Sequence, residues 1–321
     1  MPGKIVLLPP RTHLLCLLPI LATQAGCTLG EAERARQLRA ACAGGEPSAC
    51  EEIGLRLLRG DRVFRDEARA APFLEQACAG DRWEGCFELG GAYRDGRGVA
   101  EDRDRAAGLF EKACGGGLGD GCAELGLLHQ AGSGVRRDLV RAADLFEQAC
   151  ESGLTENCVR LAIAFEDGEG RDLDVPRAVE LYEAACTEKE NPDACLRLGR
   201  LYGSGEGIAR NPARAGTVFE LGCNADDHRS CAELARQYTD GDGVGQDLEL
   251  AAELYETACG GPRWWTEEGD GQSCYRLAEM YRSGTGVERN DDHAVSFFRV
   301  ACRRGYRLGC APPPPPPPDS T

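Results

Sequence analysis

The residues of this chain with the most evident chemistry are its cysteines, because 16 of the 18 are regularly spaced. They form eight pairs, and in six of these pairs the two cysteines are eight residues apart. From the second cysteine of each pair to the first of the next, the interval is always 28 residues. A fixed interval of this kind indicates a repeated structural module. The pairs are Cys42 with Cys50, Cys78 with Cys86, Cys114 with Cys122, Cys150 with Cys158, Cys186 with Cys195, Cys223 with Cys231, Cys259 with Cys274 and Cys302 with Cys310.

The number of cysteines also indicates the compartment. So many thiols are hazardous in a reducing cytosol but ordinary where they can pair as disulfides. The N-terminus agrees, because Lys4 and Arg11 precede an apolar run, Leu14 to Ala22, that is too short to span a bilayer. Small residues follow this run. The sequence therefore predicts a signal peptide over residues 1–27 and export from the cytoplasm.

The end of this segment, Ala25-Gly26-Cys27, resembles the lipobox of bacterial lipoproteins, whose cysteine is lipid-modified and becomes the mature N-terminus. Gln24 stands where a lipobox usually has Leu, so ordinary cleavage nearby is the alternative. Lipidation at Cys27 agrees with the cysteine count, because it leaves 16 cysteines to pair. We therefore expect a protein of the bacterial cell envelope, as a lipoprotein facing the periplasm or in the outer membrane, or a secreted one. Membrane contact is expected only through a lipid anchor at Cys27.

Charge and the remaining polar residues limit the function classes. The net charge of −16 excludes nucleic acid as an expected partner, because a phosphate backbone attracts basic surfaces. After removal of the signal peptide, three histidines remain in separate modules, which is a poor zinc site. No Ser stands three residues before a Lys, and no G-x-S-x-G or H-E-x-x-H motif occurs. The histidines are His129, His228 and His293.

One turn superficially suggests calcium, because four acidic residues occur between positions 167 and 174. The ligand order of an EF-hand and its terminal Glu are absent, so we expect a solvated acidic turn. The acidic residues are Asp167, Glu169, Asp172 and Asp174. The sequence predicts no metal and no cofactor.

Each 28-residue stretch reads as two helices. In the second copy Cys86, Leu89, Gly90 and Tyr93 recur at helical spacing on one face. Two glycines then interrupt the pattern, and Asp102 is a plausible N-cap for a second helix. The seven predicted copies span residues 50–78, 86–114, 122–150, 158–186, 195–223, 231–259 and 274–302.

The copies must stack, because one helix pair of this size cannot bury its apolar face. Glycine recurs inside the first helix where the second helix has to approach closely, at Gly54, Gly90, Gly126 and Gly199. The sequence thus predicts an all-α, right-handed α/α solenoid over residues 28–310, with half-units at both ends. Residues 311–321 are Pro-rich, and we expect a disordered tail or a short polyproline II rod there.

The repeat resembles the Sel1-like family, which is related to the tetratricopeptide repeats. The resemblance rests on the L-G-x-x-Y segment (residues 198–202), the G-x-G-[VI] turn (205–208) and the A-x-x-[LV]-[FY]-E-x-[AG]-C end of each copy. The cysteines resemble those of the cysteine-rich secreted branch known from Helicobacter. Members of that branch have been described as penicillin-binding proteins and weak β-lactamases, so the resemblance implies a β-lactam hydrolase as an alternative function. It supplies no catalytic residue that can be assigned in this sequence.

Two disulfide registers fit the ladder, because the start of the first helix and the end of the second lie at the same end of a helix pair. Pairing across 28 residues leaves Cys42 and Cys310 without partners, whereas pairing across the short interval leaves none over. We therefore expect the short register, which links the end of each module to the start of the next. Each such bridge contributes about 2.5 kcal/mol in the chain-entropy model.

The function that we expect from these observations is binding of a protein or peptide partner, which could be a peptidoglycan peptide, in a concave groove lined by the first helices. Enzymatic activity stays open, and the sequence leans against it. An insertion between Cys259 and Cys274 carries Trp264 and Trp265, which either contact a partner or, as we favour, pack onto the last module. The candidate groove residues are Arg94, Gln130, Glu166, Arg197, Arg236, Gln237, Arg276 and Arg282, with Trp264 and Trp265.

Overall fold

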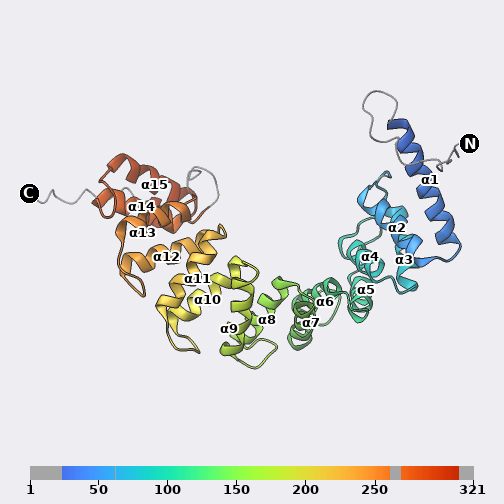
Figure 1. Ribbon diagram of the computed structural model, residues 1–321, viewed down its shortest axis with the longest axis horizontal. Coiled ribbons are helices and arrows are strands. Elements are labelled where there is room, and N and C mark those ends of the chain that lie inside the picture. The colour runs from blue at the N-terminus through green and yellow to red at the C-terminus, as the bar shows by residue number, and fades with distance from the viewer. Residues whose placement is uncertain (1–23, 62, 261–268, 311–321) are drawn as a thin grey trace, which may run out of the picture. The chain divides into compact units, whose positions relative to one another are not determined.

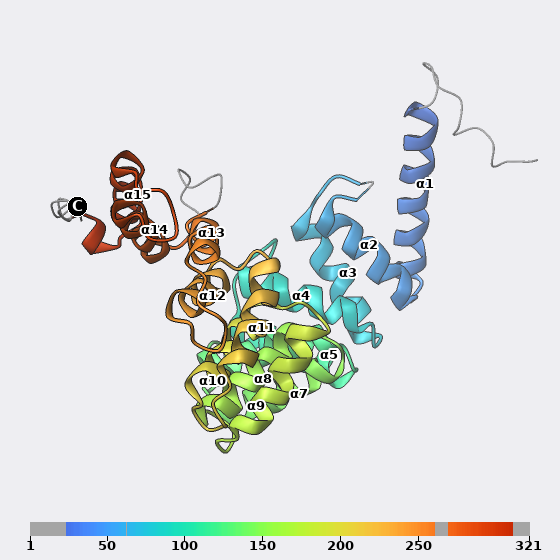
Figure 2. The ribbon, with the colours of Figure 1, turned by 60° about the vertical axis from the view of Figure 1, so that its left-hand side comes forward.

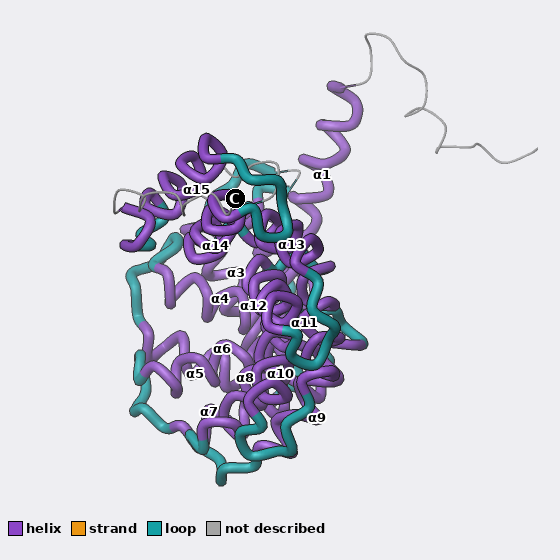
Figure 3. The backbone as a smooth tube through the Cα atoms, turned by 90° about the vertical axis from the view of Figure 1, so that its left-hand side faces the viewer, coloured by secondary structure: helices purple, strands orange, loops and turns teal. Residues whose placement is uncertain are grey.

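A computed structural model describes residues 24–61, 63–260 and 269–310. These residues form 15 α-helices, one short 3₁₀-helix and the loops between them, and they contain no strand (Figure 3). The chain divides into two compact units, residues 1–138 and 139–321, which are described separately. In the part that the structure describes, no helix is both long enough and apolar enough to cross a bilayer.

The first unit begins with a single helix and continues with two helix pairs and the first helix of a third (Figure 1). Each helix packs on the next in the chain, and α2 also contacts α4. One apolar core runs from Ala35 of α1 to Ala113 of α5. The helices are α1 (Gln24–Ala43), α2 (Pro47–Arg59), α3 (Glu67–Ala79), α4 (Trp83–Asp95), α5 (Arg103–Gly115) and α6 (Gly119–Ala131).

The second unit contains the remaining helices, again packed in chain order (Figure 2). Two apolar cores follow one another through it, from Val159 to Leu234 and from Ala235 to Ala301. The elements are α7 (Leu139–Glu151), α8 (Thr155–Asp167), α9 (Val175–Thr187), α10 (Pro192–Ser204), α11 (Pro212–Asn224), α12 (His228–Asp240), α13 (Leu248–Ala258), α14 (Gly271–Ser283), α15 (Asp291–Arg303) and η2 (Arg307–Cys310).

The turn between the two helices of a copy is fixed by a cap and by two glycines. Asp102 accepts a hydrogen bond from the backbone N–H of Arg105 and caps α5, as predicted. In the last copy, Gly284 ends α14 in the left-handed conformation. The second glycine, Gly286, lies against the previous copy, because a Cβ there would come within 2.1 Å of the Leu248 carbonyl oxygen. The G-x-G turn therefore connects successive modules as well as ending a helix.

The glycines inside the first helices allow close helix packing, as the sequence predicted. A Cβ on Gly199 would lie 2.3 Å from the Phe219 ring, and one on Gly90 would lie 2.8 Å from Phe110. Both phenylalanines are fully buried. The aromatic ring thus occupies the space that the missing side chain leaves, and the close contact offsets the roughly 1 kcal/mol that glycine costs within a helix.

All eight disulfides of the short register are present, so the predicted pairing is confirmed. The first seven join the second helix of one copy to the first helix of the next, counting α1 as a lone second helix, and the last joins α15 to η2. The bridges are Cys42 to Cys50, Cys78 to Cys86, Cys114 to Cys122, Cys150 to Cys158, Cys186 to Cys195, Cys223 to Cys231, Cys259 to Cys274 and Cys302 to Cys310.

The first helix of each copy begins before its cysteine, so the helices extend beyond the segments predicted from the ladder. Each first helix starts three residues earlier than the cysteine that opens the predicted copy, which places this cysteine at the end of the first helical turn. The side chain there faces the end of the preceding helix, where its partner lies. These opening cysteines are Cys50, Cys86, Cys122, Cys158, Cys195, Cys231 and Cys274.

The insertion before the last copy does not disturb this arrangement. Cys259 and Cys274 have the same Cα–Cα distance, 4.8 Å, as Cys186 and Cys195, although their connection is six residues longer. The spacing of the bridged backbones is therefore kept, although α13 ends at Ala258, just before its cysteine, whereas α9 continues one residue past Cys186.

Four of the sequence predictions concern the ends of the chain or the insertion. Cys27 lies in α1, which begins at Gln24, and its lipidation stays a prediction. Trp264 and Trp265 lie outside the described residues, as do the signal segment up to residue 23 and the tail at 311–321.

Candidate binding groove

A cavity of about 640 Å³ lies between α12 and α14, the first helices of the sixth and seventh copies. Arg236 and Thr239 of α12, Arg276 of α14 and Tyr255 of α13 all line it. Tyr255 is almost completely buried, with 6% of its surface exposed, whereas Arg276 is exposed. The cavity thus combines a buried phenol with solvent-accessible guanidinium groups.

The copies can be compared position by position when each is numbered from its first cysteine as position 0. Positions 2, 5 and 8 then follow one another at three-residue spacing along one face of the first helix. Position 24 is the central aromatic residue of the second helix, such as Phe110 or Phe219. This numbering shows how each junction between neighbouring first helices is filled.

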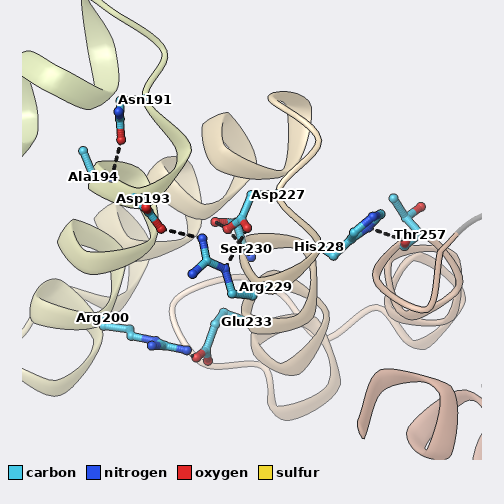
Figure 4. Close-up of polar contacts among 10 residues, drawn as sticks. All are labelled: Asn191, Asp193, Ala194, Arg200, Asp227, His228, Arg229, Ser230, Glu233 and Thr257. Carbon is cyan, nitrogen blue, oxygen red and sulfur yellow. Dashed lines mark hydrogen bonds and ion pairs between the residues drawn. The ribbon is translucent and has the colours of Figure 1, made fainter. Parts of the chain in front are cut away.

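The α10/α12 junction is closed by ion pairs (Figure 4). Arg200 of α10, at position 5, donates from Nε to Glu233 of α12, at position 2, over 3.0 Å. Arg229, just before position 0 of α12, contacts both Asp193 of α10 at 2.5 Å and Asp227 at 2.9 Å. Opposite charges therefore face each other across this junction.

The α8/α10 junction is closed by a buried tyrosine, an acid and a cation. The Tyr182 hydroxyl, at position 24, donates to Glu166 Oε2 over 2.6 Å. Arg197 of α10, at position 2, donates to the same oxygen over 3.2 Å. Burial raises the pKa of Tyr182 well above its usual range, and the hydrogen bond to Glu166 raises it further. Glu166, at position 8 of α8, is thus held between a phenol and a guanidinium.

The α12/α14 junction has the same frame without the acid. Tyr255 stands at position 24, Arg276 at position 2 of α14, and Thr239 at position 8 of α12, where α8 has Glu166. Within the described parts of the chain, Arg276 forms no ion pair or hydrogen bond, and no ion pair joins α12 to α14. Arg236, at position 5, pairs with acids of its own helix, Glu233 at 3.3 Å and Asp240 at 3.6 Å.

The charged groups around Tyr255 act on its pKa in both directions. Burial raises the pKa of Tyr255, and the polar side chain of Thr239 partly opposes this rise. The positive charges of Arg276 and Arg236 oppose it as well, whereas Asp240 adds to it. The cavity floor is therefore a neutral phenol with cationic groups beside it.

The structure separates the predicted groove residues into different environments. Arg236 and Arg276 line the cavity, whereas Glu166 and Arg197 bind each other. Arg282 pairs with Glu279 of its own helix at 2.7 Å. In the first unit, Arg94 pairs with Asp95 at 2.7 Å and Glu124 at 2.6 Å, and the Gln130 side chain is exposed on α6.

The prediction for Gln237 is wrong. Its side chain is 1% exposed, and Nε2 donates to the Pro212 carbonyl oxygen over 2.9 Å. Position 6 of the helix faces the second helix of the preceding copy, so Gln237 belongs to the core contact with α11. Conversely, the sequence interpretation did not select Tyr255 and Thr239. Aligning the copies at positions 8 and 24 would have revealed them, because Thr239 stands where another copy has Glu166.

The polar groups that could support catalysis serve as helix caps. Ser230 donates to Asp227 and Ser273 to Asp270, each over 2.7 Å, at the starts of α12 and α14. No serine hydroxyl in the described residues is hydrogen-bonded to a His or Lys side chain. The same residues contain no cluster of His, Cys, Asp or Glu that could hold a metal ion. In the acidic turn of the fourth copy, Asp174 caps α9.

The fold and the repeated junctions define an all-α repeat solenoid of the Sel1 type. The Sel1 repeat model matches seven consecutive segments, so the chain belongs to the Sel1 repeat family. The matched segments are 47–81, 83–118, 119–154, 158–189, 192–225, 228–260 and 271–306.

Solved structures show the same architecture. The chain is similar to c5321, a protective antigen of uropathogenic Escherichia coli with an SLR fold, at 26% identity and a TM-score of 0.78. That match covers 86% of this chain but 57% of the antigen, so the chain spans little more than half of that protein. A Sel1 repeat protein from Oxalobacter formigenes matches at 24% identity and a TM-score of 0.72, covering 88% of this chain and 80% of that protein.

One more solved structure matches a shorter part of the chain. Cysteine-rich protein B of Helicobacter pylori is 31% identical over 39% of this chain and 94% of its own, with a TM-score of 0.33. A search of curated proteins gave no match. The eight disulfides indicate that the chain folds in an oxidising environment, extracellular or periplasmic.

Proposed function

We propose that this Sel1 repeat protein is a scaffold that binds a segment of a partner protein, or a peptide, on the face formed by the first helices of its second unit. Sel1 repeat proteins generally mediate protein–protein interactions, and the fold presents a row of first helices for this purpose. The principal contact is at the α12/α14 junction. Hydrolysis of β-lactams is not part of this proposal, because no feature of the junction favours it.

The observation that carries the proposal is the open α12/α14 junction. Neighbouring junctions of the second unit are bridged by ion pairs, Arg197 with Glu166 and Arg200 with Glu233. At α12/α14 a cavity of about 640 Å³ takes the place of such a bridge. Its volume falls within the range of ligand pockets, and its lining offers apolar, hydroxyl and charged groups to an extended peptide.

Photo-crosslinking from inside the cavity tests the binding face. A photoreactive amino acid at Gln272, an exposed residue that lines the cavity, should crosslink a defined partner in the native envelope. The matched control places the same group at Glu253, which is exposed on α13 and does not line the cavity. Mass spectrometry identifies the partner. Equal crosslinking from both positions, or only from Glu253, would disprove the proposed face.

We further propose that the protein is exported and anchored through a lipid on Cys27. The disulfides require an oxidising compartment, and the segment before Cys27 has the pattern of a signal peptide. In the native host, globomycin should cause an unprocessed precursor to accumulate. Normal processing of the Cys27→Ser variant, with no change on globomycin treatment, would exclude the anchor.

A further inference from the structure

We infer that the α12/α14 junction recognises a carboxylate of its peptide ligand, held between the Tyr255 hydroxyl and the Arg276 guanidinium. This is the place that the Glu166 carboxylate occupies at the α8/α10 junction. The inference rests on the proposed function and specifies the ligand group that this site binds.

The two junctions share one backbone frame, which is what makes the comparison valid. Helices α8 and α12 both begin three residues before position 0 and are both 13 residues long, and so are α10 and α14. The disulfides that position α10 and α14 have equal Cα–Cα distances of 4.8 Å. These shared features align the two junctions position by position, although the intervening helices differ in length, 13 residues for α9 and 11 for α13.

Within this frame the acid at position 8 is exchanged for a neutral residue, and position 5 changes from Ile163 to Arg236. Tyr182 and Arg197 both donate to Glu166, at 2.6 and 3.2 Å. Tyr255 and Arg276 are the corresponding donors, but the corresponding residue is the shorter, neutral Thr239. A phenol and a guanidinium that converge on one carboxylate in one copy thus line a cavity in the other. A ligand carboxylate would restore the missing anionic acceptor.

The charges at positions 5 and 2 of the neighbouring first helices also favour an acidic ligand. At the α10/α12 junction, Arg200 at position 5 faces Glu233 at position 2, whereas at α12/α14 these positions are Arg236 and Arg276. Arg276 therefore lacks the acidic partner that Glu166 gives Arg197, and it faces a second positive charge at Arg236. Charge-assisted hydrogen bonds to a ligand carboxylate would satisfy it.

The other lining residues favour a carboxylate over a phosphate. Glu233, Asp240 and Glu279 also line the cavity, and their negative charge opposes a dianion more than a single carboxylate. Gln272 and Thr285 can bond to the peptide backbone beside the carboxylate. The ligand is thus a peptide with one acidic group and neutral or basic neighbours.

The test titrates the full oxidised protein with short peptides while recording the Nε–Hε NMR signals of arginine, assigned with Arg236→Gln and Arg276→Gln. The probes are acetyl-Gly-Glu-Gly-amide, which carries a side-chain carboxylate, and acetyl-Gly-Gly-Gly, which carries a C-terminal one. Acetyl-Gly-Gln-Gly-amide and inorganic phosphate are the comparison probes. The two carboxylate probes distinguish an internal acidic residue from a chain terminus as the natural ligand.

The inference predicts saturable shifts of the Arg276 signal with at least one carboxylate probe, with a Kd in roughly the millimolar range. Arg276→Gln should weaken binding at least tenfold, Arg276→Lys less, and the position-2 control Arg160→Gln not at all. Thr239→Glu supplies the acid internally and should abolish binding in a folded protein. Glu166→Thr should create a second site that shifts the Arg197 signal.

Three results would overturn the inference: equal shifts with the Gln peptide, tighter binding of phosphate than of either carboxylate, or unchanged binding in Thr239→Glu. Failure of the carboxylate site can be distinguished from failure of the proposed partner-binding face. If Gln272 crosslinks a partner while no carboxylate binds, the binding face stands and the carboxylate site falls. If a carboxylate binds but Gln272 crosslinks nothing, the site stands and the partner-binding face falls.

Discussion

The α8/α10 and α12/α14 junctions share a tyrosine at position 24 and an arginine at position 2, but of the two only the α8/α10 junction has an acid at position 8. At α8/α10, Glu166 accepts hydrogen bonds from Tyr182 and Arg197, so the surface satisfies its own polar groups. At α12/α14, Thr239 supplies no carboxylate, and Arg276 remains available beside a cavity. In this repeat protein a binding site therefore arises where one copy omits an internal contact that another copy makes.

The largest expected effect comes from the disulfides behind the two junctions. Replacing Cys186 and Cys195 by Ala should lower the free energy of unfolding by about 2.7 kcal/mol, and replacing Cys259 and Cys274 by about 3 kcal/mol. The second loss is larger because Cys259 and Cys274 are 15 residues apart in the sequence, whereas Cys186 and Cys195 are 9 apart. Urea unfolding followed by circular dichroism measures both. A clearly greater loss from the shorter loop would contradict the chain-entropy explanation.

The next largest effect is expected at alkaline pH and comes from Tyr202 of α10, whose hydroxyl donates to Glu183 of α9. Burial and a hydrogen bond to Glu183 raise the pKa of Tyr202 to about 12, against about 10 in the unfolded chain. The folded state therefore holds its proton longer, and the stability from this group, about 2 kcal/mol, is lost as pH rises from 10 through 12. Absorbance at 295 nm measures the ionisation of tyrosine. Unfolding experiments after a brief exposure to each pH measure the stability. Tyr202→Phe should make this pH dependence shallower, while Tyr182 and Tyr255, whose pKa values are also raised, retain part of it. An unchanged slope would refute the assignment.

Removing the tyrosine hydroxyl at position 24 tests the difference between the two junctions. Tyr182→Phe should cost about 1–2 kcal/mol, because Glu166 loses a hydrogen bond in a partly buried place. Tyr255→Phe should cost less than about 0.5 kcal/mol, since its hydroxyl has no acidic partner and other copies carry Phe at this position. Thermal unfolding of the two variants under identical conditions compares them. Equal losses would show that the two hydroxyls have equivalent environments.

The smallest expected effect comes from placing an acidic residue on α14 at the α12/α14 junction. Arg276→Glu places a carboxylate opposite Arg236, as Glu233 lies opposite Arg200 in the preceding junction. The pair is exposed, so we expect a gain of about 0.5 kcal/mol or less, which weakens as salt is added. Denaturation at low and high ionic strength measures this. A loss of stability at low salt would show that the two positions do not meet.

Much of the fold could be predicted from local and periodic features of the sequence. The cysteine ladder predicted all eight bridges, and the cap at Asp102 and the small residues Gly90 and Gly199 were interpreted correctly. These features depend on residues within one copy or between adjacent copies. Because the sequence repeats, each feature occurs in several copies, and a pattern that arises by chance in one copy can be recognised.

The candidate site was predicted less well. Arg236 and Arg276 were selected and do line the cavity, but Gln237, one residue away from Arg236, is buried against α11. Helical position alone did not show which arginines are already neutralised by acids of a neighbouring helix. Arg197 and Arg276 occupy the same position in their helices, yet Arg197 is paired and Arg276 has no ion-pair partner among the described residues.

The sequence by itself determined the module and its disulfide register, because each depends on short chain segments and on spacing that recurs. The tertiary structure alone decided which polar groups meet across neighbouring helices. Whether Arg276 is available depends on Thr239, which lies 37 positions earlier in the chain. Such a contact exists only once the modules have packed, because their stacking brings these two distant positions to the same junction.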